Sequence, residues 1–310
     1  MIDVFAYDSG VKPGTAKDLE TYKEKPVWID IIDITKGEAD LLRDAFDLHP
    51  LTTEDFVKSN VRVKIEEFPH YTFFVFYGMN RDDVREIDFV LGEKFLITNH
   101  RHKIPSFEEL KNNAAKLESL FKKGNDFLLH HLLDRELDNL ELGLEEFDET
   151  IESLEQQVTK KPMRVLLTNI LSLKQQLNHI RKYILAQREK ISRIAKTDIP
   201  FLSKKSLPYF RDVNDHMIRI AETLESQREG VASTFDAYTS SVSLKSNEVM
   251  KTLSIIATIA LPLTVISSLY GTNFSILPGA DNPKGFWTMI IAMALLAIGL
   301  LISFRKRGWF

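Results

Sequence analysis

The sequence predicts an α/β cytoplasmic domain, a long helical stalk and two C-terminal transmembrane helices, and therefore a membrane protein. Three patterns predict this fold class: strand-like segments in the first hundred residues, heptad repeats from Leu133, and charge-free apolar runs at 253–270 and 286–304. A helix needs about 20 apolar residues to cross the hydrocarbon of a bilayer, so both runs are long enough with modest help from their flanks. Hydrophobic residues make up only 44% of the 310-residue chain, so most of it is expected to be water-soluble.

The α/β domain is expected at residues 1–125. Residues 27–34 are rich in β-branched side chains and predict a strand. Thr35 follows, with Glu38 three residues later, which is the capping-box pattern of a helix N-terminus. We expect that helix to end at Phe46. Further strands are predicted at 72–77, 87–91 and 95–98, with the last two joined as a hairpin across Gly92-Glu93-Lys94.

An antiparallel coiled-coil hairpin is expected at residues 126–207. Apolar residues recur at alternating spacings of four and three in two stretches, which predicts two helices packed along a seam. The flanks of the first helix are acidic and those of the second are basic, and such a charge match helps to select the pairing. The predicted seam positions are Leu137, Leu140, Leu144, Phe147, Ile151, Leu154 and Val158 in the first helix, and Ile170, Leu173, Leu177, Ile180, Ile184, Gln187, Ile191 and Ile194 in the second.

A stalk helix that continues into transmembrane helix 1 is expected at residues 208–270. Between Tyr209 and Leu261 the chain has no proline and a single glycine, Gly230. Because proline is the main breaker of helices, one uninterrupted helix is the simplest structure for this stretch.

The remaining segments predict a membrane hairpin: an extracytoplasmic loop at 271–285, transmembrane helix 2 at 286–304 and a basic cytoplasmic tail at 305–310. Basic residues stay on the cytoplasmic side of a membrane. Lys251 and the tail therefore place both termini inside, in a multi-pass protein of the cytoplasmic membrane. The alternative is a pair of buried core helices, which the charge-free lengths and the basic tail disfavour.

The charge distribution argues against nucleic acid as a partner. After Met250 there are five basic residues and one acid, so residues 1–250 carry a net charge of −8. An acidic soluble part favours cations as ligands, although an ordinary solvated acidic surface has the same composition. The chain has no cysteine, which excludes disulfides and thiolate zinc sites. Phosphate-binding loops and nucleophile elbows are also missing from the sequence, so we do not expect an enzyme.

A stripe of small, polar or flexible residues follows one side of the stalk helix at spacings of three and four. Polar atoms are costly in hydrocarbon without partners, so this stripe is expected to face other helices or water. A helix–helix seam built on small residues is one interpretation, and a pore wall is the other. The stripe extends beyond the span into the soluble region, which favours the pore. Its members are Asp236, Ser243, Asn247, Met250, Leu253, Ala257, Leu261 and Thr264.

The motifs together resemble those of the CorA magnesium channel family. The family usually has Gly-Met-Asn after the first of two C-terminal spans, and this chain has Gly-Thr-Asn there. The entry into the stalk helix, the pore helix and the basic, aromatic tail are also similar to the family. The matching segments are Tyr270-Gly271-Thr272-Asn273-Phe274, residues 207–216, residues 241–264 and residues 305–310.

The resemblance implies a funnel-shaped homopentamer in the lipid bilayer, with a central pore lined by the first span. The selectivity filter then falls on Gly271, Thr272 and Asn273, and pore rings fall on the stripe. A regulatory metal site between subunits falls on Asp212 and Asp82. The transported and regulatory ion implied is Mg²⁺, with Co²⁺ and Ni²⁺ as further ions.

The chemistry of Asn273 suits Mg²⁺, which sheds its water reluctantly. A ring of neutral amide oxygens accepts hydrogen bonds from metal-bound water without trapping the ion. The alternative role for Asn273 is a helix C-cap, since Asn tolerates left-handed backbone. Thr272 in place of Met leaves the identity of the ion open, because a zinc-transporting branch of the family has Ile there. A Zn²⁺ transporter and a non-conducting, membrane-anchored coiled-coil scaffold therefore remain as alternatives.

Overall fold

The computed structural model describes residues 1–310 except 59–61, 81–82, 197, 274–276, 280–281 and 310. The chain forms two compact units, one made of residues 1–157 and 163–235 and the other of residues 158–162 and 236–310. The first unit contains a sheet of seven strands in the order β2-β1-β3-β7-β6-β5-β4. The strands are β1 (Ile2–Tyr7), β2 (Val11–Thr15), β3 (Val27–Ile32), β4 (Lys64–Glu67), β5 (Tyr71–Asn80), β6 (Asp83–Gly92) and β7 (Phe95–His100).

The strands β3 and β7 are parallel, with Val27 opposite Phe95 and Ile32 opposite His100. The other neighbouring strands pair antiparallel. Both parallel strands have buried side chains along nearly their whole length, as expected for strands covered on both faces. The carboxyl ends of β3 and β7 therefore lie next to each other at one edge of the sheet.

Short helices surround the sheet. One of them, α2 (Lys36–Phe46), begins with the capping box that the sequence predicts. The side chain of Thr35 accepts a hydrogen bond from the backbone of Glu38, and the Glu38 carboxylate accepts one from the backbone of Thr35, which confirms the capping box. The short helices are η1 (Ala16–Asp18), α1 (Leu19–Tyr22), α2 (Lys36–Phe46), α3 (Pro50–Val57), α4 (Pro105–Lys111) and α5 (Ala114–Phe121).

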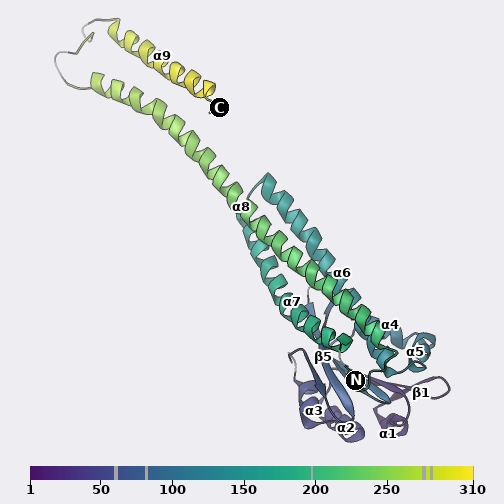
Figure 1. Ribbon diagram of the computed structural model, residues 1–310. Helices are drawn as coiled ribbons and strands as arrows, with labels where there is room; N and C mark the ends of the chain where they lie inside the picture. Colours follow the sequence, from purple (N-terminus) through teal and green to yellow (C-terminus); the bar gives the residue numbers. More distant parts are fainter. Residues whose placement is uncertain (59–61, 81–82, 197, 274–276, 280–281, 310) are drawn as a thin grey trace. The chain divides into compact units, whose positions relative to one another are not determined.

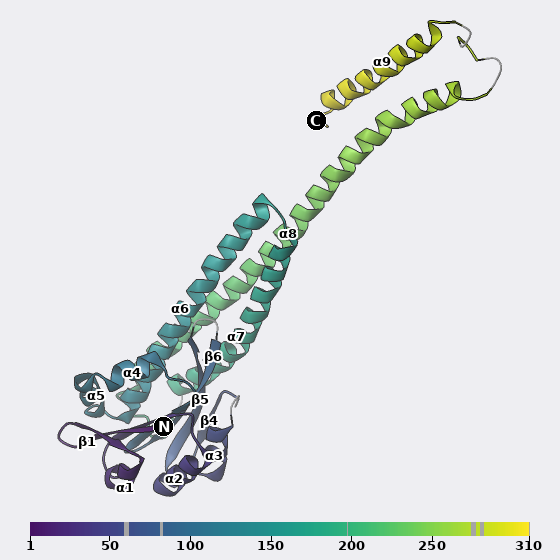
Figure 2. The ribbon, with the colours of Figure 1, turned by 180° about the vertical axis from the view of Figure 1, so that it is seen from behind.

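Three long helices lie side by side against the sheet (Figures 1 and 2). They are α6 (Asn125–Lys160), α7 (Arg164–Lys196) and the first part of α8 (Leu207–Tyr270). Every predicted seam position of α6 and α7 is buried, Gln187 included, which confirms the heptad pattern. Gln187 is buried because its side-chain oxygen accepts a hydrogen bond from the backbone N–H of Tyr77 on β5. The polar member of the seam thus ties α7 to the sheet.

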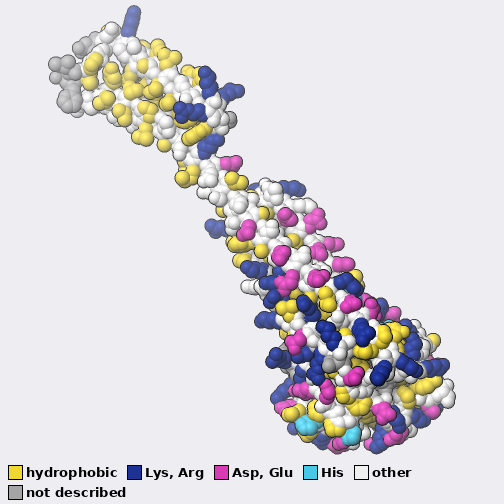
Figure 3. All heavy atoms as spheres, in the orientation of Figure 1, with side chains coloured by type: hydrophobic (Ala, Val, Ile, Leu, Met, Phe, Trp, Pro, Cys, Tyr) yellow, Lys and Arg dark blue, Asp and Glu magenta, His cyan; other side chains and the backbone are white. Residues whose placement is uncertain are grey.

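The second unit contains the two predicted membrane segments. The last part of α8 and the whole of α9 (Gly285–Lys306) are long and apolar enough to cross a membrane. Figure 3 shows hydrophobic side chains covering these helices, with Lys and Arg side chains near the C-terminal end of α9. The helix α8 continues through Pro262. At the other end of the hairpin, the Lys251 ammonium donates to the carbonyl of Gly308 at 3.3 Å.

A buried ionic cluster joins β3 to α4. Asp30 is fully buried, and the Lys111 ammonium lies 2.6 Å from its Oδ2. The same ammonium lies 2.8 Å from Asp3 and 2.7 Å from Glu108. Burial by itself lowers the pKa of Lys111, but these carboxylates outweigh it and raise the pKa above its ordinary value. Two further groups contact the other oxygen of that carboxylate: His100 Nε2 lies 3.0 Å from Asp30 Oδ1, and the Thr98 hydroxyl donates to the same atom.

Replacing Lys111 by Met should destabilise the α/β fold by about 3–5 kcal/mol, because it breaks a buried ion pair and leaves the Asp30 charge without its lysine partner. The measurement is urea unfolding of the detergent-purified chain, followed by the fluorescence of Trp28 with Trp287 and Trp309 replaced by Phe. The matched control is Lys116→Met, since Lys116 is exposed. Equal stability of the two variants would contradict the proposed role of the cluster.

Candidate functional site

The Gly-Thr-Asn segment forms the turn that ends α8. The Gly271 N–H donates to the carbonyl of Ser267 at 3.0 Å, and the Thr272 hydroxyl donates to the carbonyl of Leu269 at 2.8 Å. Gly271, Thr272 and Asn273 are all exposed. Asn273 does not have the left-handed backbone of a C-cap, which among described non-glycine residues occurs at Ser9, Asp33, Asp47 and Phe201. The exposed Asn273 is thus not a left-handed C-cap of α8.

The predicted stripe on α8 is exposed along its whole length in the single chain. Its large apolar members Met250, Leu253 and Leu261 are 63%, 59% and 64% exposed. Asp236, Ser243, Asn247, Ala257 and Thr264 are exposed as well. The Thr264 hydroxyl donates to the carbonyl of Ala260 at 2.9 Å, so its oxygen presents lone pairs outward. The stripe is thus a surface of hydrogen-bond acceptors and apolar side chains without a partner inside the subunit.

Asp212 is exposed near the start of α8. The other residue of the predicted regulatory pair, Asp82, lies outside the described residues. The electrostatic influence of Asp212 reaches His130 and Asp134 on α6. This acidic end of α8 therefore faces ionisable side chains of the neighbouring helix.

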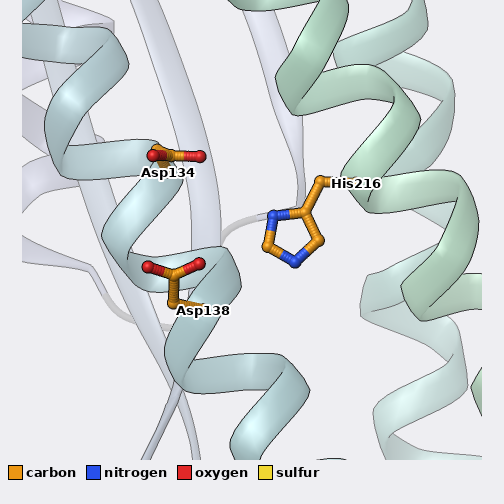
Figure 4. Close-up of side chains that lie close together, drawn as sticks. All are labelled: Asp134, Asp138 and His216. Atoms are coloured by element: carbon orange, nitrogen blue, oxygen red, sulfur yellow. The ribbon is translucent and has the colours of Figure 1, made fainter.

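A second group of potential metal ligands lies between α6 and α8 (Figure 4). Asp134 and Asp138 are one helical turn apart on α6, and the imidazole of His216 points toward them from α8. One ligand atom from each side chain lies within 4.8 Å of the others. His216 Nε2 is 2.9 Å from Oε2 of Glu141, which leaves Nδ1 for a metal ion. A carboxylate that holds the far nitrogen of an imidazole is the usual outer partner of a metal-binding histidine.

The donor set favours a transition metal over Mg²⁺. Two carboxylates and one imidazole suit Co²⁺, Ni²⁺ or Zn²⁺, whereas Mg²⁺ prefers oxygen ligands alone. Burial raises the pKa of Asp134, and the nearby charges of Asp138 and Asp212 raise it further, which a bound cation would reverse. The other carboxylate cluster, Asp3, Asp30 and Glu108, has no room for a metal because the Lys111 ammonium contacts all three.

Comparison with known proteins decides the family. Residues 23–306 match the model of the family described as CorA-like Mg2+ transporter protein. The chain belongs to this family. It is 34% identical over 296 residues to the cobalt/magnesium transport protein CorA of Thermotoga maritima, covering 92% of this chain and 83% of that protein.

Two further relatives extend the comparison. The solved structure of the CorA magnesium transporter from Methanocaldococcus jannaschii has a TM-score of 0.89 at 22% identity, covering 100% of this chain and 99% of that one, and so shares the fold. The zinc transport protein ZntB of Yersinia enterocolitica is 22% identical over 308 residues, covering 97% of this chain and 92% of that protein. This CorA family member thus has the α/β domain, the helical stalk and the two apolar C-terminal helices that its sequence predicts.

Sequence reasoning missed the Asp134, Asp138 and His216 cluster. The spacing of the two aspartates is visible in the sequence, because side chains at i and i+4 share one face of a helix. It is hidden among many other acids on α6, however, and nothing in the sequence pairs that face with His216, which is 78 residues further along the chain than Asp138.

The cluster predicts tight binding of Co²⁺ that depends on His216. Replacing His216 by Ala should remove one Co²⁺ per chain in equilibrium dialysis of the purified protein. Glu141→Gln should weaken the same site by about 10–100-fold, as for other partners of metal-binding histidines. His70→Ala is the control, since His70 is exposed. Unchanged Co²⁺ binding in His216→Ala would show that the three side chains do not form a metal site.

Proposed function

We propose that this chain is the subunit of a homopentameric channel that carries Mg²⁺ into the cell across the cytoplasmic membrane, with both termini in the cytoplasm. The observation that carries the proposal is the exposed stripe of α8, which leads to the exposed Gly271-Thr272-Asn273 turn in a member of the CorA-like family. Co²⁺ and Ni²⁺ are further transported ions, in keeping with the cobalt/magnesium transport protein to which the chain is similar. The family consists of transporters, so an enzymatic role has no support.

The stripe supplies the chemistry that a hydrated Mg²⁺ ion needs. A ring of Asn273 amides forms the selectivity filter with the backbone of Gly271 and Thr272. Rings of Thr264 and Asn247 offer further neutral oxygens that accept hydrogen bonds from metal-bound water. Because these oxygens are neutral, the ion is guided without the slow release that a carboxylate ring would impose.

Apolar rings supply the closed gate. Leu261, Leu253 and Met250 are large, flexible or branched side chains that are about two-thirds exposed in the single chain. A narrow pore lined by such side chains excludes water and thereby stops ions. Ala257 and Ser243 provide small spacers between the rings, and Asp236 provides a carboxylate at the cytoplasmic end.

Cytoplasmic Mg²⁺ closes the channel by binding between subunits at Asp212 and Asp82. Two carboxylates that face each other repel when empty, and a divalent ion between them removes the repulsion. Loss of the ion loosens the ring of stalks and opens the gate. The adjacent Asp134, Asp138 and His216 cluster gives transition metals a second point of control on the same pair of helices.

A Zn²⁺ transporter is the alternative within the family, favoured by the similarity to a zinc transport protein and by Thr272 at the filter position. A non-conducting coiled-coil scaffold is the alternative from another class. Flux of Mg²⁺, Co²⁺ and Zn²⁺ into proteoliposomes separates the three. We expect Mg²⁺ flux; zinc flux with a pH dependence favours the first alternative, and no flux of any ion favours the second.

Replacing Asn273 by Ala should abolish Mg²⁺ flux into these proteoliposomes, because the filter loses its ring of amide acceptors. Asn282→Ala is the matched control. Asn282 lies in the same connection between α8 and α9, but its side chain accepts a hydrogen bond from the backbone of Lys284. Normal flux through Asn273→Ala would contradict the assignment of the filter.

Replacing Asp212 by Ala should raise the Mg²⁺ concentration that protects the detergent-purified protein from proteolysis, because each subunit interface loses a carboxylate. Asp215→Ala is the control, since Asp215 is also exposed and lies one turn further along α8. If both variants are protected at the same Mg²⁺ concentration as the unchanged protein, Asp212 is not part of a regulatory site.

A further inference from the structure

A cavity of about 200 Å³ opens at the edge of the sheet where β3 and β7 end. Its walls come from the turn after β3, the end of α3, the end of β5, the start of β6 and the turn after β7. In sheets with parallel strands, ligands commonly bind outside the carboxyl ends of those strands. This cavity lies at such a place, far along the chain from the α8 residues assigned to the pore.

Asp88 lines the cavity, and one of its carboxylate oxygens lacks a hydrogen-bond partner. The residue is only 1% exposed. Its Oδ2 accepts a hydrogen bond from Asn99 Nδ2 at 2.8 Å, whereas its Oδ1 is buried without a partner. The Asn99 amide cannot serve both oxygens, since Nδ2 also donates to the carbonyl of Phe56 at 3.1 Å. An orphaned buried acceptor on a cavity wall calls for a donor from outside the chain.

Other carboxylates lie near Asp88 and make the electrostatic environment of the cavity negative. Glu86 is two residues away on the same face of β6 and also lines the cavity. The charges of Glu86 and of Asp55 on α3 both disfavour a negative charge on Asp88. Burial first, and then these two charges, raise the pKa of Asp88 well above its ordinary value. Asp33 and Asp83 lie on the exposed rim.

The cations near Asp88 are already bound to other groups. Lys64 lies 2.6 Å from Asp55 and 2.8 Å from Glu66, and Lys58 pairs with Glu54. Arg85 pairs with Asp83 at 3.2 Å. His100 makes its two hydrogen bonds to Asp30 and to the carbonyl of His102. Arg101 and His102, on the exposed rim, are the remaining basic residues of the lining. None of these cations satisfies Asp88 Oδ1.

We propose that this cavity binds one hydrated Mg²⁺ ion, whose water ligands donate hydrogen bonds to Asp88 Oδ1 and to Glu86. Mg²⁺ keeps several of its waters when it binds to proteins. A cavity of about 200 Å³ has room for the ion together with several of its waters. The site is internal to one subunit and is separate from both Asp212 and the pore. The proposal of this site therefore does not depend on the proposed transport.

The test is Mg²⁺ binding to the detergent-purified full-length protein, measured by equilibrium dialysis at millimolar Mg²⁺. Asp88→Asn should lose one bound Mg²⁺ per chain. Glu86→Gln, a change at a half-buried position, should weaken the site and serves if Asp88→Asn fails to fold. Asp47→Asn is the control, since Asp47 is exposed and lies outside the cavity.

The outcomes are distinct. Loss of one Mg²⁺ in Asp88→Asn, but not in Asp47→Asn or Asp212→Ala, supports the site. Equal Mg²⁺ binding by Asp88→Asn and by the unchanged protein overturns it. Mg²⁺ flux measured with the same variants tests transport separately, because the proposed pore contains neither Asp88 nor Glu86.

Discussion

The packing of α8 against α6 and α7 is the interaction on which the rest of the first unit (residues 1–157 and 163–235) depends. One face of α8 is buried through most of its first seven turns, and polar side chains fix its register against α6. Gln227 donates to the carbonyl of Leu144 at 2.7 Å, and His216 bonds to Glu141. On α7, Arg181 pairs with Glu225. The buried apolar residues of this part of α8 include Phe210, Val213, Met217, Ile220, Ala221, Leu224 and Val231.

This packing also decides which ionisable groups meet. With one face of α8 committed to the other helices, His216 lies inside against α6 while Asp212, four residues earlier, stays exposed. The two candidate regulatory positions therefore differ in kind. His216 can complete a site within one subunit, whereas the role proposed for Asp212 requires a ligand from another chain. Both are held on the same rigid helix, so an ion at either acts on the same element.

Three buried acids of the first unit are stabilised in three different ways. Asp30 is ionised against Lys111 and His100. Glu136 of α6 accepts hydrogen bonds from Ser106 and Asn139, and burial raises its pKa. Asp88 accepts one hydrogen bond, from the Asn99 amide, and lines a cavity. Burying a carboxylate without a counter-charge is costly, so a group such as Asp88 is either protonated or matched by a cation from solution. That contrast is the reason for assigning an ion to this cavity.

The sequence by itself determined four of the seven strands, the capping box at Thr35, the seams of α6 and α7 and the two apolar segments. All of these depend on periodicity or on neighbours within a few residues, which are local properties of the chain. It also placed the exposed stripe on α8 and the turn at Gly271–Asn273, because a helix repeats every 3.6 residues. Only the tertiary structure decided which distant side chains meet: His216 with Asp134 and Asp138, Lys111 with Asp30, and Asp88 with Asn99 over a cavity. Asp88 was visible as an acid within an apolar strand, but its missing partner depends on packing by α3 and β7, and no local pattern encodes those contacts.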